Sequence, residues 1–320
     1  MDKLIALAKN PVPSGAIVGM FQGHDGALLR FARWQPTRGP RRGTVCLFGG
    51  RTEFIEKYFE VIADLRRRGF GVATMDWRGQ GGSRRALPNP RKGHLLDFSE
   101  FDRDLLRFVK DIVLPDCLPP FIALGHSMGG HVLMRNAITN GSWFDRIVVL
   151  APMLAFHPER VKYPGWFARG VTSAAALGGL STMYIPGGTD EPQEYGPFVG
   201  NPLTSNLERW SRNRAVLEAA PELALGSPTY GWTHAAYRSM AHLMQPEVPF
   251  RVQVPLLIFS AGHDRVISNR ATEDFANQLK VGTHIQIPAA RHEILQENDD
   301  VRGRFWAAFD AYLGVESGVL

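Results

Sequence analysis

A serine between two glycines is the residue of this 320-residue chain best placed to do chemistry. It lies in the sequence Gly-His-Ser-Met-Gly at 125–129, after the apolar run 121–124 and before a helical pattern over 131–137. This context predicts a sharp turn from strand to helix, in which flanking side chains would clash and glycine is required. We therefore expect the hydroxyl of Ser127 to stand clear of the sheet as a nucleophile.

A serine hydroxyl is a weak nucleophile near neutral pH, and it needs a base that is oriented by a carboxylate. With this kind of turn, the order along the chain is serine, acid, histidine. Asp264 follows the apolar run 256–259, and His292 follows the run 283–287, so both are expected in loops just past a strand. We predict Ser127 as the nucleophile, His292 as general base and then acid, and Asp264 as the group that fixes the imidazole tautomer.

Each of these assignments has a structural alternative. His292 is also compatible with a loop residue that caps the following segment, and Asp264 with an ordinary turn residue. Asp145 and Asp299 are weaker candidates for the acid. The remaining nearby histidines, His126 and His263, are expected to pack or to bond locally.

Acyl transfer also needs hydrogen-bond donors for the oxyanion that forms on the substrate. The amide of Met128, at the start of the helix after the serine, is one predicted donor. The amide of Arg51 is the other, because Gly49 and Gly50 let the backbone pass close to the reacting carbon. The alternative is that these two glycines merely end a strand.

Strands that alternate with helices of ten or more residues predict a mostly parallel sheet with helices on both faces. The expected strands are 16–21, 28–34, 44–48, 71–75, 121–124, 147–150, 255–259 and 283–287, and the main helices are 54–67, 98–113, 131–137, 271–279 and 301–313. The alternation stops after the sixth strand. The intervening residues 152–250 are rich in Pro, Gly and aromatic residues, and we expect them to form a largely helical lid over the carboxyl ends of the strands.

The charge of the chain does not favour a nucleic-acid partner. The net charge is +5, but its arginines are scattered rather than gathered in a basic stripe. Arg66, Arg67 and Arg68 are expected to form a solvated helix end. Cys46 lies in an apolar strand pattern and is expected in the core. No secretory signal or span of about 18 apolar residues is visible, so we expect a reduced, cytoplasmic location.

Four motifs together resemble the α/β-hydrolase superfamily, in its branch of bacterial lysophospholipases and monoacylglycerol lipases grouped with serine aminopeptidase-like hydrolases. They are Phe-Gly-Gly-Arg at 48–51, Asp-Trp-Arg-Gly-Gln-Gly-Gly-Ser at 76–83, Gly-His-Ser-Met-Gly-Gly at 125–130 and His-Glu-Ile-Leu-Gln-Glu at 292–297. Many relatives have His-Gly where this chain has Gly-Gly-Arg. The resemblance implies a core of residues 1–151 and 251–320 around the lid 152–250, and it assigns the 76–83 loop a structural role only.

The resemblance also implies an activity: hydrolysis of a carboxylic ester of a single-chain lipid, a lysophospholipid or a monoacylglycerol, without metal or cofactor. Candidate substrate-binding residues are Gly50, Trp166, Phe167, Met183 and Tyr184. An apolar helix over 171–180 is expected to line an acyl tunnel or to touch a bilayer. The alternative is that these apolar residues form the lid's own core. The acidic residues at 190, 191 and 194 are expected either in a solvated loop or against a cationic headgroup.

Other activities fit the same catalytic residues. A small-ester esterase, a thioesterase or a peptidase would use them equally, whereas a non-catalytic scaffold would have no need of all three. An epoxide hydrolase or dehalogenase would carry aspartate in place of Ser127. We expect a small lipid or ester as partner, with transient contact to a membrane surface, and no nucleic acid. The oligomeric state stays open.

Overall fold

An eight-stranded sheet forms the centre of the computed structural model, which describes residues 3–139, 141–161 and 165–315. The strands are β1 (Ile17–Gln22), β2 (Leu28–Trp34), β3 (Thr44–Phe48), β4 (Gly71–Met75), β5 (Phe121–His126), β6 (Arg146–Leu150), β7 (Leu256–Ala261) and β8 (Gly282–Ile287). Their order across the sheet is β1-β2-β4-β3-β5-β6-β7-β8. The expected strands are therefore confirmed, with bounds that differ by one or two residues.

Strand β2 runs opposite to the other seven strands of the sheet. β1 pairs with β2, and β2 with β4, in antiparallel fashion, and every pair from β4 to β8 is parallel. Strands β3, β4, β5 and β7 are buried along their whole length, as a sheet covered on both faces requires. This is the α/β-hydrolase arrangement, and the predicted class, a mostly parallel sheet with helices on both faces, is confirmed.

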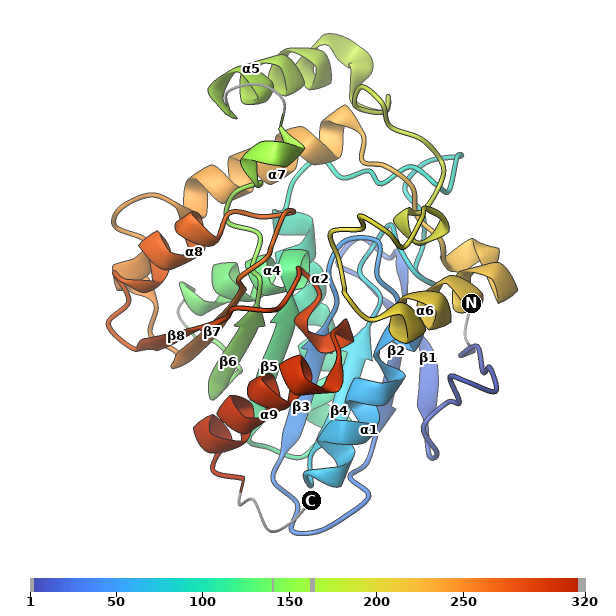
Figure 1. Cartoon of the computed structure of the whole chain (residues 1–320), viewed down its shortest axis with the longest axis vertical. Helices are drawn as coiled ribbons and strands as arrows, with labels where there is room; N and C mark the ends of the chain where they lie inside the picture. Colours follow the sequence, from blue (N-terminus) through green and yellow to red (C-terminus); the bar gives the residue numbers. More distant parts are fainter. Residues whose placement is uncertain (1–2, 140, 162–164, 316–320) are drawn as a thin grey trace.

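Helices cover both faces of the sheet and build a separate apolar core on each (Figure 1). The first face carries α1 (Phe59–Arg67) and α9 (Asp299–Leu313), and the second carries α2 (Ser99–Phe108), α4 (Ser127–Ala137) and α8 (Asn269–Ala276). Phe305 and Phe309 of α9 are fully buried on the first face, and Phe101 and Phe275 lie on the second. The carboxyl ends of the parallel strands remain free for loops that bear chemistry.

Two expected helices are interrupted. The stretch 54–67 begins as a 3₁₀ turn, η1 (Ile55–Tyr58), before α1. The stretch 98–113 passes from α2 into the π-helical turn η2 (Val109–Val113) and the short α3 (Leu114–Asp116). Neither interruption carries a helix-breaking residue at its start, so periodicity alone could not reveal it.

The segment between β6 and β7, residues 151–255, contains no strand among its described residues. Its main helices are α5 (Gly165–Ala175), which continues into the π-helical turn η4 (Ala176–Leu180), α6 (Leu207–Ala219) and α7 (Tyr230–Leu243). In Figure 1, α5 and α7 lie at the end of the molecule toward which the parallel strands point, whereas α6 lies beside α1. No helix in the described part of the chain is long and apolar enough to cross a bilayer.

The expectation of a solvated arginine run at 66–68 is wrong for two of its three members. Arg66 and Arg68 are each only 6% exposed. Arg66 donates to the carbonyl of Gln35, and Arg68 pairs with Asp310 and lies over the Trp306 ring. A run of like charges hides such partners, because they come from distant parts of the sequence. Cys46, by contrast, is fully buried as expected.

Candidate active site

The turn between β5 and α4 holds Ser127 in a left-handed conformation, with φ of 49°. A side chain on Gly125 would meet Leu133 at 2.6 Å, and one on Gly129 would meet the carbonyl oxygen of Gly49 at 2.5 Å. Glycine is required at both positions because backbone and core leave no room for a Cβ. The elbow expected from the pentapeptide is therefore present, and it lifts the serine to the carboxyl edge of the sheet.

Three side chains from distant parts of the chain meet at this edge. The Oγ of Ser127 is 3.0 Å from Nε2 of His292, and Nδ1 of His292 is 2.7 Å from Oδ2 of Asp264. The other oxygen of Asp264 accepts from the amides of Val266 and Ile267, at 2.7 and 3.0 Å. An ionised carboxylate can only accept, so Nδ1 donates and Nε2 is left to accept the serine proton. The arrangement is that of a nucleophile, a base and an orienting acid.

The alternative acids lie elsewhere. Asp145 accepts from the amide of Phe121, at the opposite end of β5. Asp299 begins α9 and pairs with Arg209.

Burial tunes the two ionisable groups of this triad in a useful way. Burial lowers the pKa of His292 from its ordinary value of 6.5, and this outweighs the opposing effect of Asp264. The pKa of Asp264 is also lowered: burial alone would raise it, but His292 and the two backbone amides hold it down. At neutral pH the imidazole is therefore a free base beside a charged carboxylate, which are the forms that proton abstraction needs.

His126 was expected to pack or to bond locally; it is packed in the interior, but its hydrogen-bond partners lie far away in the sequence. Its Nε2 is 3.1 Å from the carbonyl oxygen of His292, and its Nδ1 is 3.2 Å from Oε2 of Glu53. Both neighbours are acceptors, so the ring satisfies them only when both of its nitrogens carry protons. Although burial opposes it, the charge of Glu53 raises the pKa of His126 above its ordinary value. A cationic His126, whose ring lies 4.8 Å from that of His292, in turn disfavours protonation of the base.

Glu53 also shapes the loop that is expected to bind the oxyanion. Its Oε2 accepts from the amide of Gly50 and from the hydroxyl of Tyr58. The amide of Gly50 is thereby committed to Glu53. The amide of Arg51 has no hydrogen-bond partner among residues 3–139, 141–161 and 165–315. Met128 is the second residue of α4, where an N–H has no acceptor inside the helix. The two predicted donors are thus available.

The 76–83 loop braces this oxyanion loop from the other side. Nε2 of Gln80 donates to the carbonyls of Gly50, at 2.7 Å, and Glu53, at 3.0 Å. The indole of Trp77 donates to the carbonyl of Gly49 at 2.9 Å. Sequence reasoning assigned this loop no catalytic part, and the contacts agree that its work is indirect.

The loop that carries His292 rests on residues 201–205 of the β6–β7 segment. The amide of Glu293 donates to the carbonyl of Leu203 at 2.8 Å, and the hydroxyl of Thr204 donates to the carbonyl of Gln296 at 2.7 Å. The carboxylate of Glu297 accepts from the amide and the hydroxyl of Ser205. We call residues 201–205 the platform. The residues of the platform, Asn-Pro-Leu-Thr-Ser, form no local pattern that indicates where they would dock.

A buried ion cluster lies below the platform. Nζ of Lys57 is 2.6 Å from Glu293, 3.1 Å from Glu53 and 3.8 Å from Glu194. Burial raises the pKa of Glu293 to about 7 despite this lysine. Glu194 is only 2% exposed, so it does not belong to a solvated loop or face a headgroup; Asp190 and Glu191 are exposed.

The predicted substrate-binding residues fall into two groups. Gly50 lies against the nucleophile, since a side chain on it would meet Cβ of Ser127 at 3.1 Å. Trp166, Phe167 and Met183 are 76%, 42% and 51% exposed. They are not the core of a lid, so that alternative is wrong for them. The hydroxyl of Tyr184 donates to Asp190.

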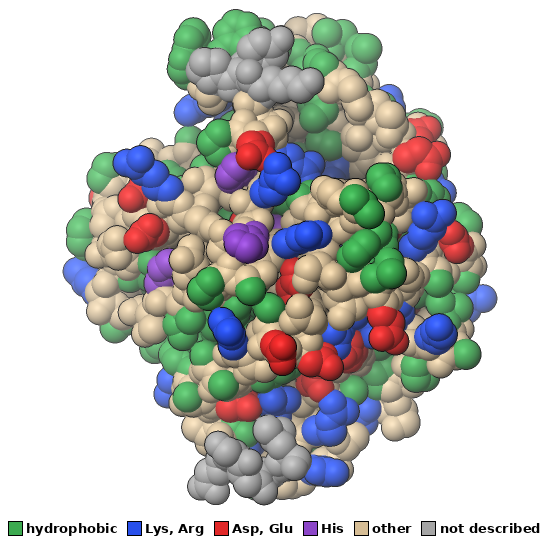
Figure 2. Space-filling view, in the orientation of Figure 1, with side chains coloured by type: hydrophobic (Ala, Val, Ile, Leu, Met, Phe, Trp, Pro, Cys, Tyr) green, Lys and Arg blue, Asp and Glu red, His purple; other side chains and the backbone are tan. Residues whose placement is uncertain are grey.

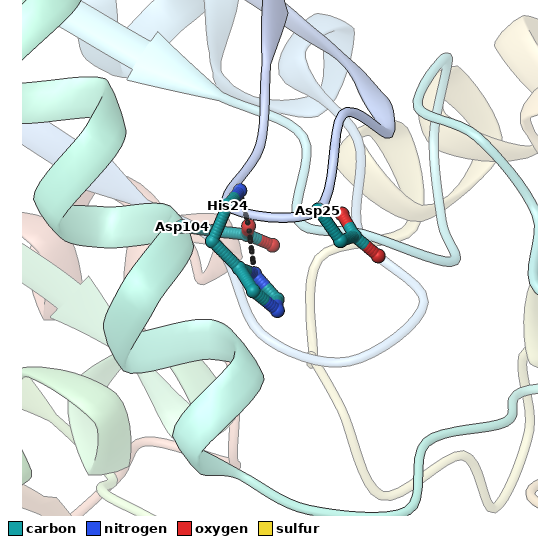
Figure 3. Close-up of side chains that lie close together, drawn as sticks. All are labelled: His24, Asp25 and Asp104. Atoms are coloured by element: carbon teal, nitrogen blue, oxygen red, sulfur yellow. Dashed lines mark hydrogen bonds and ion pairs between the residues drawn. The ribbon is translucent and has the colours of Figure 1, made fainter.

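One cluster of side chains has the composition of a metal site. His24 and Asp25, in the turn between β1 and β2, lie beside Asp104 in the middle of α2 (Figure 3). The guanidinium of Arg78 already binds this group: its Nε is 2.5 Å from Asp104 and its Nη2 is 3.0 Å from Asp25. A metal ion would have to displace this cation, so the cluster is explained as an arginine site.

Comparison with known proteins agrees with this geometry. Residues 39–299 match the family model described as "Serine aminopeptidase, S33". The chain belongs to this family. Lysophospholipase L2 of Escherichia coli (strain K12) is 29% identical over 289 residues, which cover 88% of this chain and 83% of that protein. Monoglyceride lipase of Rattus norvegicus is 28% identical over 277 residues, with coverage of 85% and 86%.

Solved structures place the S33 family member in the α/β-hydrolase fold. A soluble variant of monoglyceride lipase from Saccharomyces cerevisiae, in complex with a substrate analog, superposes with a TM-score of 0.73. That match is 20% identical and covers 94% of this chain and 97% of the other. A carboxyl esterase from Bacillus coagulans gives 0.70 at 19% identity, with coverage of 96% and 100%.

Proposed function

We propose that this S33 family member hydrolyses the carboxylic ester of a single-chain lipid, a lysophospholipid or a monoacylglycerol, through an acyl-enzyme on Ser127. The observation that carries the proposal is the continuous chain of contacts from Oγ of Ser127 through His292 to Asp264. Curated relatives that match most of the chain are named lysophospholipase and monoglyceride lipase. Those names support the substrate class.

The reaction follows from the site. His292 takes the proton of Ser127 as Oγ attacks the ester carbonyl, and Asp264 stabilises the resulting imidazolium. The amides of Arg51 and Met128 stabilise the oxyanion, and a donor of this kind is worth ~2.7–4 kcal/mol of the barrier. His292 then protonates the departing glycerol oxygen, and a water molecule, activated by the same imidazole, releases the fatty acid.

The test is fatty-acid release from a 1-acyl lysophospholipid and a 1-acylglycerol by the wild-type and Ser127→Ala proteins. We expect the variant to lose on the order of 10⁴-fold or more in kcat, as removal of a nucleophile does. A fluorophosphonate probe should label the wild type but not the variant. Fatty-acid release by Ser127→Ala at the wild-type rate would contradict the proposal, and failure of the probe to react would favour a non-catalytic scaffold.

The same experiment, extended to short p-nitrophenyl esters, acyl thioesters and peptides, separates the other activities. A small-ester esterase, a thioesterase or a peptidase would prefer one of those substrates over the long-chain lipids. The small-ester esterase is included among the alternatives because the fold is similar to that of a carboxyl esterase.

We further propose that residues 152–250 act as a lid and that α5 touches the surface of the lipid aggregate. Trp166 is 76% exposed and Leu177 is 81% exposed, and both lie on α5 or its continuation η4. Side chains of this kind partition into the interfacial region of a bilayer. Figure 2 shows apolar side chains gathered at the top of the molecule, where Figure 1 has α5.

A further inference from the structure

His126 hydrogen-bonds to both of the loops that bear the proposed catalytic groups. Its Nε2 is 3.1 Å from the carbonyl oxygen of His292, the predicted base. Its Nδ1 is 3.2 Å from Oε2 of Glu53, which ends the oxyanion loop, residues 49–53. The same Oε2 accepts from the amide of Gly50. One chain of hydrogen bonds therefore runs from the backbone of the oxyanion loop, through two side chains, to the backbone of the base.

The carboxylate in the middle of this chain is firmly held. Glu53, His126 and His292 are all buried. Oε2 of Glu53 also accepts from the hydroxyl of Tyr58 at 2.6 Å, and its Oε1 lies 3.1 Å from Nζ of Lys57. Although burial would raise it, Lys57 and His126 hold the pKa of Glu53 well below its ordinary value. A charged carboxylate with this many donors is a fixed point against which neighbouring groups are placed.

Gly50 is where the chain of hydrogen bonds comes closest to the nucleophile. A Cβ on Gly50 would meet both Nδ1 of His126 and Cβ of Ser127 at 3.1 Å. The carbonyl of Gly50 accepts from Nε2 of Gln80 at 2.7 Å. Because the C=O and the N–H of a trans peptide point in opposite directions, this bond also directs the amide of Arg51, a predicted oxyanion donor. A displaced Gly50 would therefore tilt that donor.

A second buried histidine shows that packing alone does not require such an arrangement. The ring nitrogens of His131, on α4, are each 2.6 Å from a partner, the carbonyl oxygen of Met153 and Oγ of Ser239. A hydroxyl can donate or accept, so a neutral ring satisfies both, and burial lowers the pKa of His131 to about 3. His126 instead faces two acceptors and has to carry a charge, which costs free energy to bury. The core gains nothing from that charge, whereas the site does.

Resting on the proposed ester hydrolysis, we infer that His126 and Glu53 are positioning residues that hold the backbone of the base and the oxyanion loop at a fixed separation. They take no part in the proton transfers. They keep the imidazole that accepts the proton and the amides that bind the oxyanion directed at the same carbonyl group. A protonated imidazole suits this role because it is a rigid ring that donates from both nitrogens.

The test separates the transition state from the ground state. An alkyl trifluoromethyl ketone adds to the serine hydroxyl as a charged tetrahedral adduct, whereas a 1-O-alkylglycerol is an ether and binds without reaction. Titration calorimetry in neutral detergent micelles gives the Kd of each for the wild type and for His126→Phe, which keeps an aromatic ring and loses both donors. We expect kcat/KM for 1-oleoylglycerol to fall on the order of 10²-fold, as a small misplacement of reacting groups does. The Kd of the ketone should rise by the same factor, and that of the ether should stay unchanged.

Two further variants separate positioning from stability. His131→Phe is the matched control, because it removes two hydrogen bonds of a buried ring whose partners, Met153 and Ser239, lie outside the triad and the oxyanion loop. It should lower the free energy of unfolding and leave the ratio of the two Kd values unchanged. His126→Gln keeps one donor, so it should raise the ratio of ketone to ether Kd by less than His126→Phe does. It decides the test if the phenylalanine variant does not fold.

Three results would overturn the inference. They are an equal rise of both Kd values, an unchanged kcat/KM in a folded variant of His126, and the same change of the Kd ratio in the His131→Phe protein. The Kd of the ketone does not depend on turnover of a lipid. If the wild type hydrolysed neither 1-oleoylglycerol nor a lysophospholipid while the shift in the ketone Kd remained, this would count against the proposed function alone.

Discussion

Helices α5 and α6 belong to the same segment between β6 and β7, yet they differ in how they are held. In α5 only Thr172 is buried, among described residues, and several of its large apolar side chains face solvent. In α6 five residues are buried, and Arg209 donates to Glu60, Asp299 and the carbonyl of Glu297. The segment therefore combines one part, α5, that is loosely attached with another, α6, that is packed against the loop carrying His292.

The difference in how firmly the two helices are held corresponds to the role of each region. Residues 201–219 hold the loop of His292, which must keep its geometry to within a fraction of an ångström for proton transfer. Residues 165–180 touch no member of the triad through any described hydrogen bond. Their proposed work, contact with lipid, tolerates movement and requires exposed apolar surface.

Matched arginine substitutions in the two helices give the largest expected contrast. Arg209→Met removes four described hydrogen bonds and takes away one of the positive charges that pair with the carboxylate of Glu60. We expect the free energy of unfolding to fall by about 3 kcal/mol. Arg169→Met, at an exposed position of α5, should change it by less than about 0.5 kcal/mol. Urea unfolding followed by circular dichroism measures both. Similar losses in the two variants would erase the distinction between the helices.

The platform should also control the pH dependence of catalysis. His292 is active as the free base, and its lowered pKa means that activity persists below pH 6.5 and disappears as the pH falls through the folded value. Thr204→Val removes the hydrogen bond to the carbonyl of Gln296 and loosens the loop. Water then reaches the imidazole, its desolvation decreases, and the acidic limb of kcat/KM should move up toward 6.5.

The control for this profile is Ser173→Ala, which removes a hydroxyl of α5 that bonds to Arg169 and His234. Its acidic limb should coincide with that of the wild type. If both variants shifted the acidic limb of kcat/KM equally, or if neither did, the platform would not be what excludes water from the imidazole of His292.

The smallest expected effect on stability is in the apolar surface of α5 and η4. Trp166→Ser combined with Leu177→Ser should change the free energy of unfolding by less than about 0.5 kcal/mol, because both side chains already face solvent. Binding to lipid vesicles should nevertheless fall more than tenfold, since burying such a side chain is worth about 1.5–3 kcal/mol. Leu207→Ser, at a 57% exposed position of α6, is the control and should bind vesicles like the wild type. If the double variant sedimented with vesicles to the same extent as the wild type, this would count against membrane contact through α5.

The sequence was sufficient to predict the order of strands and helices and to select Ser127, Asp264 and His292, which the structure brings into contact. Buried parallel strands are continuous apolar runs, and the nucleophile turn needs glycines at fixed positions, so both leave local patterns. Glu53, Gln80 and the platform left no such pattern, because each acts through contacts with segments far away in the chain. His126 illustrates the point: it adjoins the nucleophile in sequence, but its partners are Glu53 and the carbonyl of His292.

Exposure was equally hidden in the sequence. The apolar residues around 166 and 177 have the composition of a core, and only the position of α5 at the edge of the molecule shows that they face outward. Arg66 and Arg68 are of a residue type usually found at the surface, but Arg66 is buried against Gln35 and Arg68 against Asp310. In both cases tertiary neighbours decide what local composition leaves open.

The platform has a consequence for how the enzyme comes into being. Thr204 and Gln296, which are joined by a hydrogen bond, are separated by 92 positions of the chain. Ser127 and His292 are separated by 165 positions. During synthesis the serine and its elbow emerge well before the imidazole and the segment that supports it. A nascent or truncated polypeptide that ends before residue 292 thus holds an unactivated alcohol, and hydrolytic capacity appears only once the C-terminal strand and helix have joined the sheet.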